Sequence, residues 1–130
     1  MPELQLDDTS QLILALAVQE AYRLNHHSVG SAHLFLAFTR EPEGELCKPL
    51  SELGFSAEGL RLLVRQALVP GRPGSVLSPE EISGNYTESV RHALQVSRQV
   101  AGREGAAVVG ERHLLVAFLT SGLGSIFNLL

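Results

Sequence analysis

The chain has 130 residues, of which 45% are hydrophobic and 18% are charged, and its formal net charge is −4. These values are typical of one globular domain with a buried core, and they exclude a disordered chain. The lysines and arginines are scattered, so the sequence lacks the basic stripe that nucleic-acid binding requires.

The sequence also argues against a membrane or secreted protein. The longest apolar run, Leu12 to Val18, is far shorter than the roughly 20 residues that cross a bilayer. The N-terminus has neither the positive region nor the apolar region of a signal peptide. Cys47 is the single cysteine, which excludes an internal disulfide and fits a reducing compartment. We therefore expect a cytoplasmic location.

Helical periodicity dominates, and no segment shows the sustained alternation of a strand. The pattern predicts an all-α fold, with Ser31 and Ser56 as helix N-caps. Proline and glycine cluster from Val69 to Ser75 and the polar stretch continues to Gly84, which predicts a linker over residues 70–84. The helices are expected over residues 8–24, 31–40, 45–53, 56–69, 86–103, 111–121 and 124–130.

The two halves of the chain are copies of one unit. Residues 6–50 align with residues 86–130 at an offset of 80 without a gap, and 12 of the 45 pairs are identical, where average composition gives roughly three. The chain is thus expected to be one domain with a first repeat at residues 6–69 and a second, shorter repeat at residues 85–130. A tandem four-helix repeat with pseudo-two-fold symmetry is predicted. The identical pairs are Leu14/Leu94, Gln19/Gln99, Ala21/Ala101, Arg23/Arg103, Val29/Val109, Gly30/Gly110, His33/His113, Leu34/Leu114, Ala37/Ala117, Phe38/Phe118, Gly44/Gly124 and Leu50/Leu130.

The predicted helix at residues 56–69 has no counterpart in the second repeat. Its absence is expected to expose apolar surface there, unless a partner, a second copy of the chain or further chain covers it. A homo-oligomer formed through this end is one possibility. The residues expected at this exposed end are Phe118, Ile126, Phe127 and Leu130.

No constellation in the sequence points to catalysis or to a cofactor. A P-loop motif is absent, and the glycine pairs near residues 102–105 and 122–124 lack the preceding strand of a phosphate-binding turn. His26 and His27 with Cys47 match no structural zinc spacing, so a polar loop and a core thiol are the preferred interpretation. A small hydrolase or metal protein would rest on these residues alone.

His33 and His113 occupy equivalent positions, each in a Gly-x-x-His-Leu sequence at a predicted helix start. One interpretation is a shared polar contact or proton donor. The preferred one is a partly buried histidine that anchors the loop to the helix, repeated with the unit. Asp7, Asp8 and Glu88 precede or begin helices, where negative charge complements the helix dipole.

Several short motifs resemble one known repeat. Leu24–Leu36 and Val109–Leu115 share a Val-Gly-x-x-His-Leu core that is similar to the Gly-Thr-Glu-His-Leu-Leu core of the Clp N-terminal repeat. Tyr86-Thr87-Glu88 resembles the opening of that repeat, and Arg40–Gly44 resembles its Arg-Glu-Gly-Glu-Gly turn. Leu50–Phe55 is similar to its Leu-x-x-Leu-Gly-Val segment. The similarity covers nearly the whole chain.

This resemblance implies the N-terminal domain of a Clp/Hsp100 AAA+ unfoldase of the ClpA or ClpC type. Such a domain is a docking platform that recruits adaptor proteins or substrates for unfolding and degradation, and it performs no chemistry itself. Free-standing relatives bind and regulate the Clp protease core, which is the alternative function. The partners implied are therefore a Clp adaptor, a substrate, or a Clp peptidase or ATPase subunit.

The sequence departs from one branch of the family, which binds phosphorylated arginine through the acid of Gly-Thr-Glu-His. Ala32 and Arg112 stand at those positions, and Asp7 replaces one of the two phosphate-contacting threonines, the other being Thr87. Alanine removes the acceptor and arginine repels the guanidinium, so we expect phosphoarginine recognition to be lost. The expected partner-binding face comprises Asp7, Ser31, Ala32, Thr87, Glu111 and Arg112.

Overall fold

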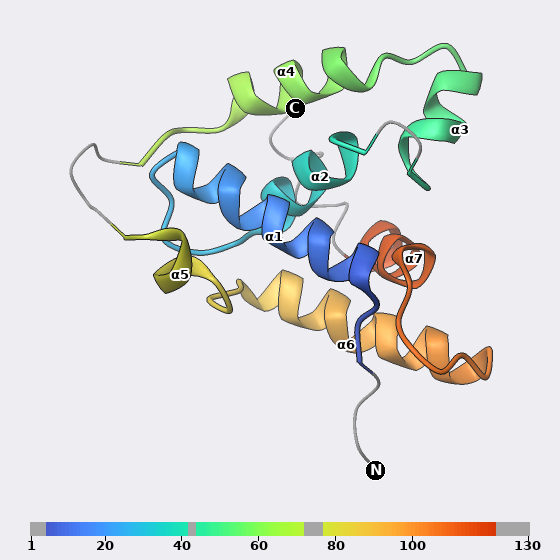
Figure 1. Cartoon of the computed structure of the whole chain (residues 1–130). Helices are drawn as coiled ribbons and strands as arrows, with labels where there is room; N and C mark the ends of the chain where they lie inside the picture. The colour runs from blue at the N-terminus through green and yellow to red at the C-terminus, as the bar shows by residue number, and fades with distance from the viewer. Residues whose placement is uncertain (1–4, 42–43, 72–76, 122–130) are drawn as a thin grey trace.

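A computed structural model of the chain describes residues 5–41, 44–71 and 77–121 (Figure 1). Over these residues the fold is all-helical, as predicted, with isolated backbone bridges in place of strands. The predicted helix at residues 124–130 lies outside them. The helices are α1 (Asp8–Arg23), α2 (Ser31–Thr39), α3 (Cys47–Glu52), α4 (Ala57–Ala67), α5 (Pro79–Ile82), α6 (Glu88–Arg103) and α7 (Glu111–Ser121).

Two helix pairs, α1 with α2 and α6 with α7, form the body of the domain, and α4 packs on α2 at one side (Figure 1). The two pairs are tied together by extended segments that cross between the repeats. Leu6 bridges Val109, and Val29 bridges Tyr86. The two bridges are equivalent, because an offset of 80 relates Leu6 to Tyr86 and Val29 to Val109. The predicted pseudo-two-fold relation therefore holds in the backbone itself.

The hydrogen bonds at the two crossings repeat in the same way. The Asp7 N–H donates to the Val109 carbonyl at 2.9 Å, and the Thr87 N–H donates to the Val29 carbonyl at 3.0 Å. Asp7 then caps α1 through its side chain, and Thr87 caps α6. Each crossing thus ends where a long helix begins, and fixes the direction of that helix.

The helix starts confirm one predicted cap and correct another. Ser56 caps α4, with its hydroxyl accepting a hydrogen bond from the Gly59 N–H at 3.1 Å. Ser31 is not the cap of α2; Gly30 occupies the cap position and Ser31 is the first helical residue. The Gly30 N–H donates to the His33 ring at 2.8 Å. With Gly30 as the cap, α2 begins at Ser31, one residue earlier than it would begin if Ser31 were the cap.

One hydrophobic core runs through both repeats. Half of the twelve identical pairs of the duplication are buried apolar residues, and among them Leu34/Leu114, Ala37/Ala117 and Phe38/Phe118 have no exposed surface. The expectation that Phe118 is exposed is therefore wrong. Its ring lies 5.7 Å from that of its own equivalent, Phe38, and 6.3 Å from that of Phe35. The other residues of the expected apolar end, Ile126, Phe127 and Leu130, lie outside the described residues.

The predicted linker contains the short helix α5, which the sequence reading did not anticipate. Ser78 caps α5, Pro79 begins it, and Ser78 and Glu81 form a capping box. Ile82 is 1% exposed and joins the core, and α5 packs against α1. The segment between the repeats thus contributes to packing as well as connecting the two units.

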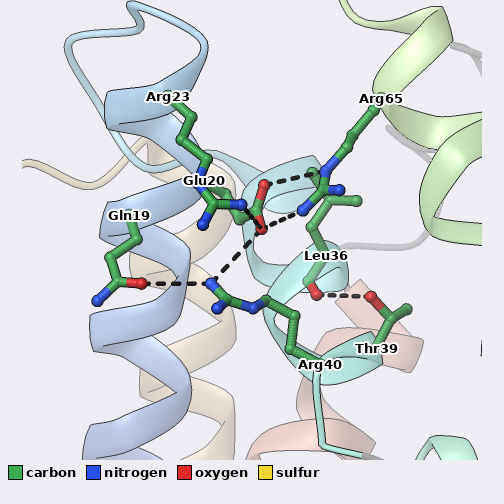
Figure 2. A network of polar contacts seen from close by, with 7 residues as sticks. All are labelled: Gln19, Glu20, Arg23, Leu36, Thr39, Arg40 and Arg65. Carbon is green, nitrogen blue, oxygen red and sulfur yellow. Dashed lines mark hydrogen bonds and ion pairs between the residues drawn. The ribbon is translucent and has the colours of Figure 1, made fainter. Parts of the chain in front are cut away.

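A buried carboxylate holds α4 in place (Figure 2). Glu20 in α1 is 1% exposed, and the Arg65 guanidinium of α4 donates to both of its oxygens, at 2.6 and 3.3 Å. This geometry is the bidentate pairing that arginine and carboxylate favour. Beside it, the Thr39 hydroxyl donates to the Leu36 carbonyl at 2.6 Å near the end of α2.

Along the described residues, no helix is both long enough and apolar enough to span a membrane.

The Phe38–Phe118 contact makes a stability prediction. Phe38→Ala removes a fully buried ring at the meeting of the repeats, so we expect the free energy of unfolding to fall by about 3–5 kcal/mol. Urea denaturation measures the change. Leu119→Ala, at a 42% exposed position on α7, is the control and is expected to cost less than about 1 kcal/mol. Equal losses in the two variants would contradict a core that joins both repeats.

Candidate functional site

The six residues of the expected partner-binding face lie at two equivalent junctions, one at the start of α2 and one at the start of α7. At the first junction Thr87 faces Gly30, where a side-chain carbon on the glycine would lie 3.6 Å from the Thr87 methyl. At the second, a carbon on Gly110 would lie 3.3 Å from an Asp7 carboxylate oxygen. Each junction therefore combines the start of a second helix in one repeat with the cap residue of the other repeat.

The first junction opens into a pocket of about 470 Å³. Its wall is supplied by three separate parts of the chain, namely the loop between α1 and α2, the start of α6, and the chain that follows α4. The Asn85 amide donates to the His27 carbonyl at 2.7 Å, which ties the loop to the second repeat. The lining residues are Asn25, His26, His27, Ser28, Gly30, His33, Gly71 and Thr87.

Two residues of the pocket wall carry backbone constraints. Asn25 has a positive φ of 58°, a conformation that asparagine tolerates better than most residues, and its equivalent in the second repeat is Gly105 at 71°. Gly71 donates from its N–H to the Leu24 carbonyl at 2.7 Å, and a side-chain carbon on Gly71 would overlap the Asn25 carbonyl. The close approach of these two segments therefore requires glycine at position 71.

Ser31 and Ala32 were expected on the partner-binding face, but they do not line the pocket. They are 5% and 8% exposed, respectively, so they lie behind the surface. The Ser31 hydroxyl is buried without a protein hydrogen-bond partner among the described residues. Thr87, which is partly exposed, is the one residue of the expected face that lines this pocket.

A chain of hydrogen bonds through two histidines supports the pocket. Because the Gly30 N–H donates to Nδ1 of His33, the neutral His33 ring carries its proton on Nε2 and donates it to Nδ1 of His26 at 2.7 Å. The His26 ring then donates from Nε2 to the Val69 carbonyl, also at 2.7 Å. Burial, with a smaller contribution from the neighbouring His26, lowers the pKa of His33 to about 4, which keeps it neutral. This arrangement agrees with the preferred interpretation of His33 as an anchor between loop and helix.

The second junction has the same anchor with a different partner. The Gly110 N–H donates to Nδ1 of His113 at 2.9 Å, and Nε2 of His113 donates to the Glu104 carboxylate at 2.7 Å. Arg112 also donates to both oxygens of Glu104, at 2.7 and 2.8 Å. The His113 bond, aided by Arg112, lowers the pKa of Glu104. The second junction is therefore held by an exposed ion-pair cluster instead of a histidine pair.

Glu111 contacts the turn before α3. Its carboxylate accepts a hydrogen bond from the Glu45 N–H at 3.1 Å, and burial raises the pKa of Glu111. Asp7 is engaged as the cap of α1. The polar groups expected at the second half of the face are thus occupied by contacts within the chain.

The structure also places the thiol and the histidines that suggested a metal site. Cys47 is 4% exposed, and its Sγ lies 3.4 Å from the carbonyls of Phe38 and Thr39, in agreement with a core thiol. Burial raises the pKa of Cys47. Over the described part of the chain, no group of three or more histidine, cysteine or acidic side chains has the arrangement of a metal site.

The comparison with protein families decides the identity of this fold. The profile of the family described as "Clp repeat (R) N-terminal domain" matches residues 5–130. The chain belongs to this Clp N-terminal domain family. The resemblance inferred from the repeated Val-Gly-x-x-His-Leu core is thereby confirmed.

Individual relatives agree with the family assignment. The chain is 31% identical over 90% of its length to the negative regulator of genetic competence ClpC/MecB of Bacillus subtilis. It is 30% identical over 90% of its length to the chaperone protein ClpB of Oceanobacillus iheyensis. It spans 14% of the length of each of these relatives. The Clp N-terminal domain is a non-catalytic domain of these AAA+ proteins.

Solved structures support the fold. The N-terminal domain of ClpD from Arabidopsis thaliana matches with a TM-score of 0.72 and 16% identity, covering 96% of this chain and 84% of that one. The N-domain of ClpV from Vibrio cholerae matches with a TM-score of 0.73 and 16% identity, covering 95% of this chain and 76% of that one.

The buried His33 ring makes a pH prediction. Its pKa in the folded state, about 4, is lower than the 6.5 of an unperturbed histidine, so the unfolded state binds one more proton between these values. Stability is therefore expected to fall as the pH falls from 6.5 to 4, by up to about 3 kcal/mol from this group.

Urea denaturation between pH 7.5 and pH 4 measures this contribution. His33→Gln is expected to be less stable than the parent at pH 7.5 and to lose less stability on acidification. His92→Gln, at an exposed position on α6, is the control and keeps the parental pH dependence. The same pH dependence in His33→Gln and the parent would rule out His33 as the titrating group.

Proposed function

We propose that this Clp N-terminal domain is a docking module that binds a segment of an adaptor or substrate protein for a Clp/Hsp100 unfoldase. The single observation that carries the proposal is the pocket at the first junction, which is built from both repeats. The family of the domain supports the same function, and the sequence holds no P-loop of its own. Unfolding and degradation would be the work of other parts of such a machine.

The pocket has a defined shape because its walls are tied to one another. The His33–His26–Val69 chain connects the start of α2 to the chain after α4, and the Asn85 amide connects the loop to the second repeat. Both connections are short, at 2.7 Å. A pocket whose walls are held in this way loses little conformational entropy when a segment binds.

The pocket favours an uncharged segment that carries both apolar and polar groups, because most of its exposed lining surface is apolar. Its lining offers an amide at Asn25 and hydroxyls at Ser28 and Thr87, together with the neutral His33 ring. The Thr87 oxygen accepts from the Val90 N–H, so the hydroxyl proton remains available for donation. Backbone carbonyls or side-chain amides of a bound peptide match these groups.

The second junction supports the proposal less well. Arg112, Glu104 and His113 are joined to one another, and Glu111 is joined to the turn before α3. A ligand would have to break these bonds before it bound. We therefore assign docking to the first junction, with Thr87 as the residue retained from the expected face.

A matched pair of variants tests the docking site. Ser28→Arg fills the pocket with a long charged side chain, whereas Val108→Arg places the same side chain at the equivalent, exposed position of the second repeat. We expect Ser28→Arg to abolish affinity capture of a Clp adaptor or substrate from lysate of the source organism, identified by mass spectrometry. Val108→Arg is expected to retain it.

Two results would count against this proposal. Loss of capture in Val108→Arg alone would move the site to the second junction. Capture of no adaptor, substrate or Clp subunit by the parent domain would contradict the docking function itself. Far-ultraviolet circular dichroism of each variant confirms that the helices are retained.

The departures at positions 32 and 112 yield a separate prediction. Ala32 offers no acceptor and is 8% exposed, and Arg112 places a cation where the family has an acid. Free phosphoarginine is therefore expected to bind no better than arginine, because neither junction pairs with its guanidinium. Titration followed by nuclear magnetic resonance checks this, and a saturable shift of the Thr87 amide by phosphoarginine alone would refute it.

A further inference from the structure

Three arginines from three different elements surround the buried Glu20 carboxylate (Figure 2). One oxygen, Oε1, lies 2.6 Å from Arg65, 3.7 Å from Arg40 and 3.9 Å from Arg23. Arg23 ends α1, Arg40 follows α2 and Arg65 lies on α4. We call these three residues the arginine cluster.

The cluster carries more positive charge than Glu20 can neutralise. Arg65 makes the bidentate pair, and the contacts of Arg23 and Arg40 with Oε1 are longer than a hydrogen bond. Arg40 otherwise donates to the Gln19 side chain at 3.3 Å. Among the described residues, two guanidiniums therefore remain without a matched carboxylate, in a chain whose net charge is −4.

The fold does not require this surplus. The Arg65–Glu20 pair alone satisfies the buried carboxylate and ties α4 to α1, and bringing further cations to the same oxygen adds repulsion among them. In the second repeat the positions equivalent to Glu20 and Arg40 are Val100 and Thr120. The α6–α7 pair, which is equivalent to the α1–α2 pair, thus packs without the cluster.

The cluster is accessible and belongs to a wider basic surface. The Arg23 side chain is 57% exposed, Arg65 is 31% exposed and Arg40 is 24% exposed. Arg61 precedes Arg65 by one turn of α4, so the two side chains lie on the same face of this helix. Basic groups thus extend along α4 and across the ends of α1 and α2.

We propose that the arginine cluster is a second docking surface, which binds the carboxylates of an acidic segment in a partner protein. The planar fork of each guanidinium matches a carboxylate, and Arg23 and Arg40 each have donors to offer. Carboxylates spaced along a peptide reach the two arginines separately and keep clear of the Glu20 anion between them. A compact phosphate has two charges close together and is repelled by that anion.

This surface uses none of the residues that line the pocket at the first junction, so it goes beyond the proposed function. The acidic segment and the segment in the pocket can belong to one partner, and binding at the two surfaces is measured separately. Failure of either proposal leaves the other to stand on its own residues.

The test uses the whole chain and a fluorescent peptide of about 12 residues in which glutamate alternates with glycine. A peptide with glutamine in place of glutamate is the uncharged probe, and pyrophosphate is the phosphate probe. Arg23→Gln combined with Arg40→Gln removes the surplus charge but keeps the Arg65–Glu20 pair. Arg91→Gln combined with Arg103→Gln is the matched control, because Arg103 is the equivalent of Arg23 and both residues are exposed.

Fluorescence anisotropy at low salt measures the peptide affinities. We expect the glutamate peptide to bind, the glutamine peptide not to bind, and the cluster variant to bind the glutamate peptide roughly fivefold to tenfold more weakly than the parent. The control variant is expected to stay within about twofold of the parent, and binding to the parent weakens as salt is added.

Three results would overturn the proposal. The first is an equal loss of affinity in the cluster variant and in the control variant, which would show only an effect of net charge. The second is the absence of binding of the glutamate peptide to the parent. The third is competition by pyrophosphate with tighter binding than the peptide, which would assign the cluster to small phosphates. Thermal unfolding of both double variants verifies that the Arg65–Glu20 pair still holds α4.

Discussion

The crossing of the two extended segments is the contact on which the rest of the structure depends. Each segment leaves its own repeat, hydrogen-bonds beside Val29 or Val109 of the other repeat, and then caps a long helix through Thr87 or Asp7. A chain that crosses twice in this way cannot separate its repeats without losing two bridges and the backbone hydrogen bonds beside them. The crossings also bring the cap of one repeat against the glycine at the next helix start, which creates both junctions.

The two junctions show how a duplicated scaffold can come to hold two different surfaces. Their anchors are alike, since Gly30 with His33 and Gly110 with His113 make the same backbone-to-ring bond. The difference lies in which group accepts the hydrogen bond from Nε2 of each ring. In the first repeat the acceptor is His26, and its equivalent in the second repeat is Ala106. In the second repeat the acceptor is Glu104, and its equivalent in the first repeat is Leu24. One substitution at each site leaves the first junction neutral and open and the second charged and closed by ion pairs.

The sequence predicted the repeat because half of the identities at an offset of 80 lie in the core, where packing restricts the choice of residue. Ala21 and Ala101, Val29 and Val109, and Leu34 and Leu114 have no exposed surface. Helix positions were likewise predictable, since capping residues and glycines mark their ends. The helix α5 was not, because four residues give too short a pattern for any periodicity, although Ser78, Pro79 and Glu81 together carry a capping signal.

The candidate site was harder to predict because it depends on contacts between distant segments. Family position alone suggested Ser31 and Ala32, which the first turn of α2 turns inward. Val69 and Gly71 contact the loop after α1 through their backbone atoms, and such contacts do not restrict which side chain the residue carries. The exception is position 71, where the close approach requires glycine. The positive φ at Asn25 is the one local signal, since asparagine and its equivalent glycine both favour that conformation.

The helix α4 of the first repeat both covers apolar surface on α2 and brings Arg65 to the Glu20 carboxylate. Where α4 packs on α2, Leu36 is fully buried and Thr39 is 2% exposed, whereas their equivalents Val116 and Leu119 on α7 are 40% and 42% exposed. The expectation of an exposed apolar end was wrong for Phe118, which points into the contact between the repeats. In the first repeat, α4 thus adds the charge of Arg65 to those of Arg23 and Arg40 around Glu20. The same helix that closes the first repeat thus gives it the basic surface that the described part of the second repeat lacks.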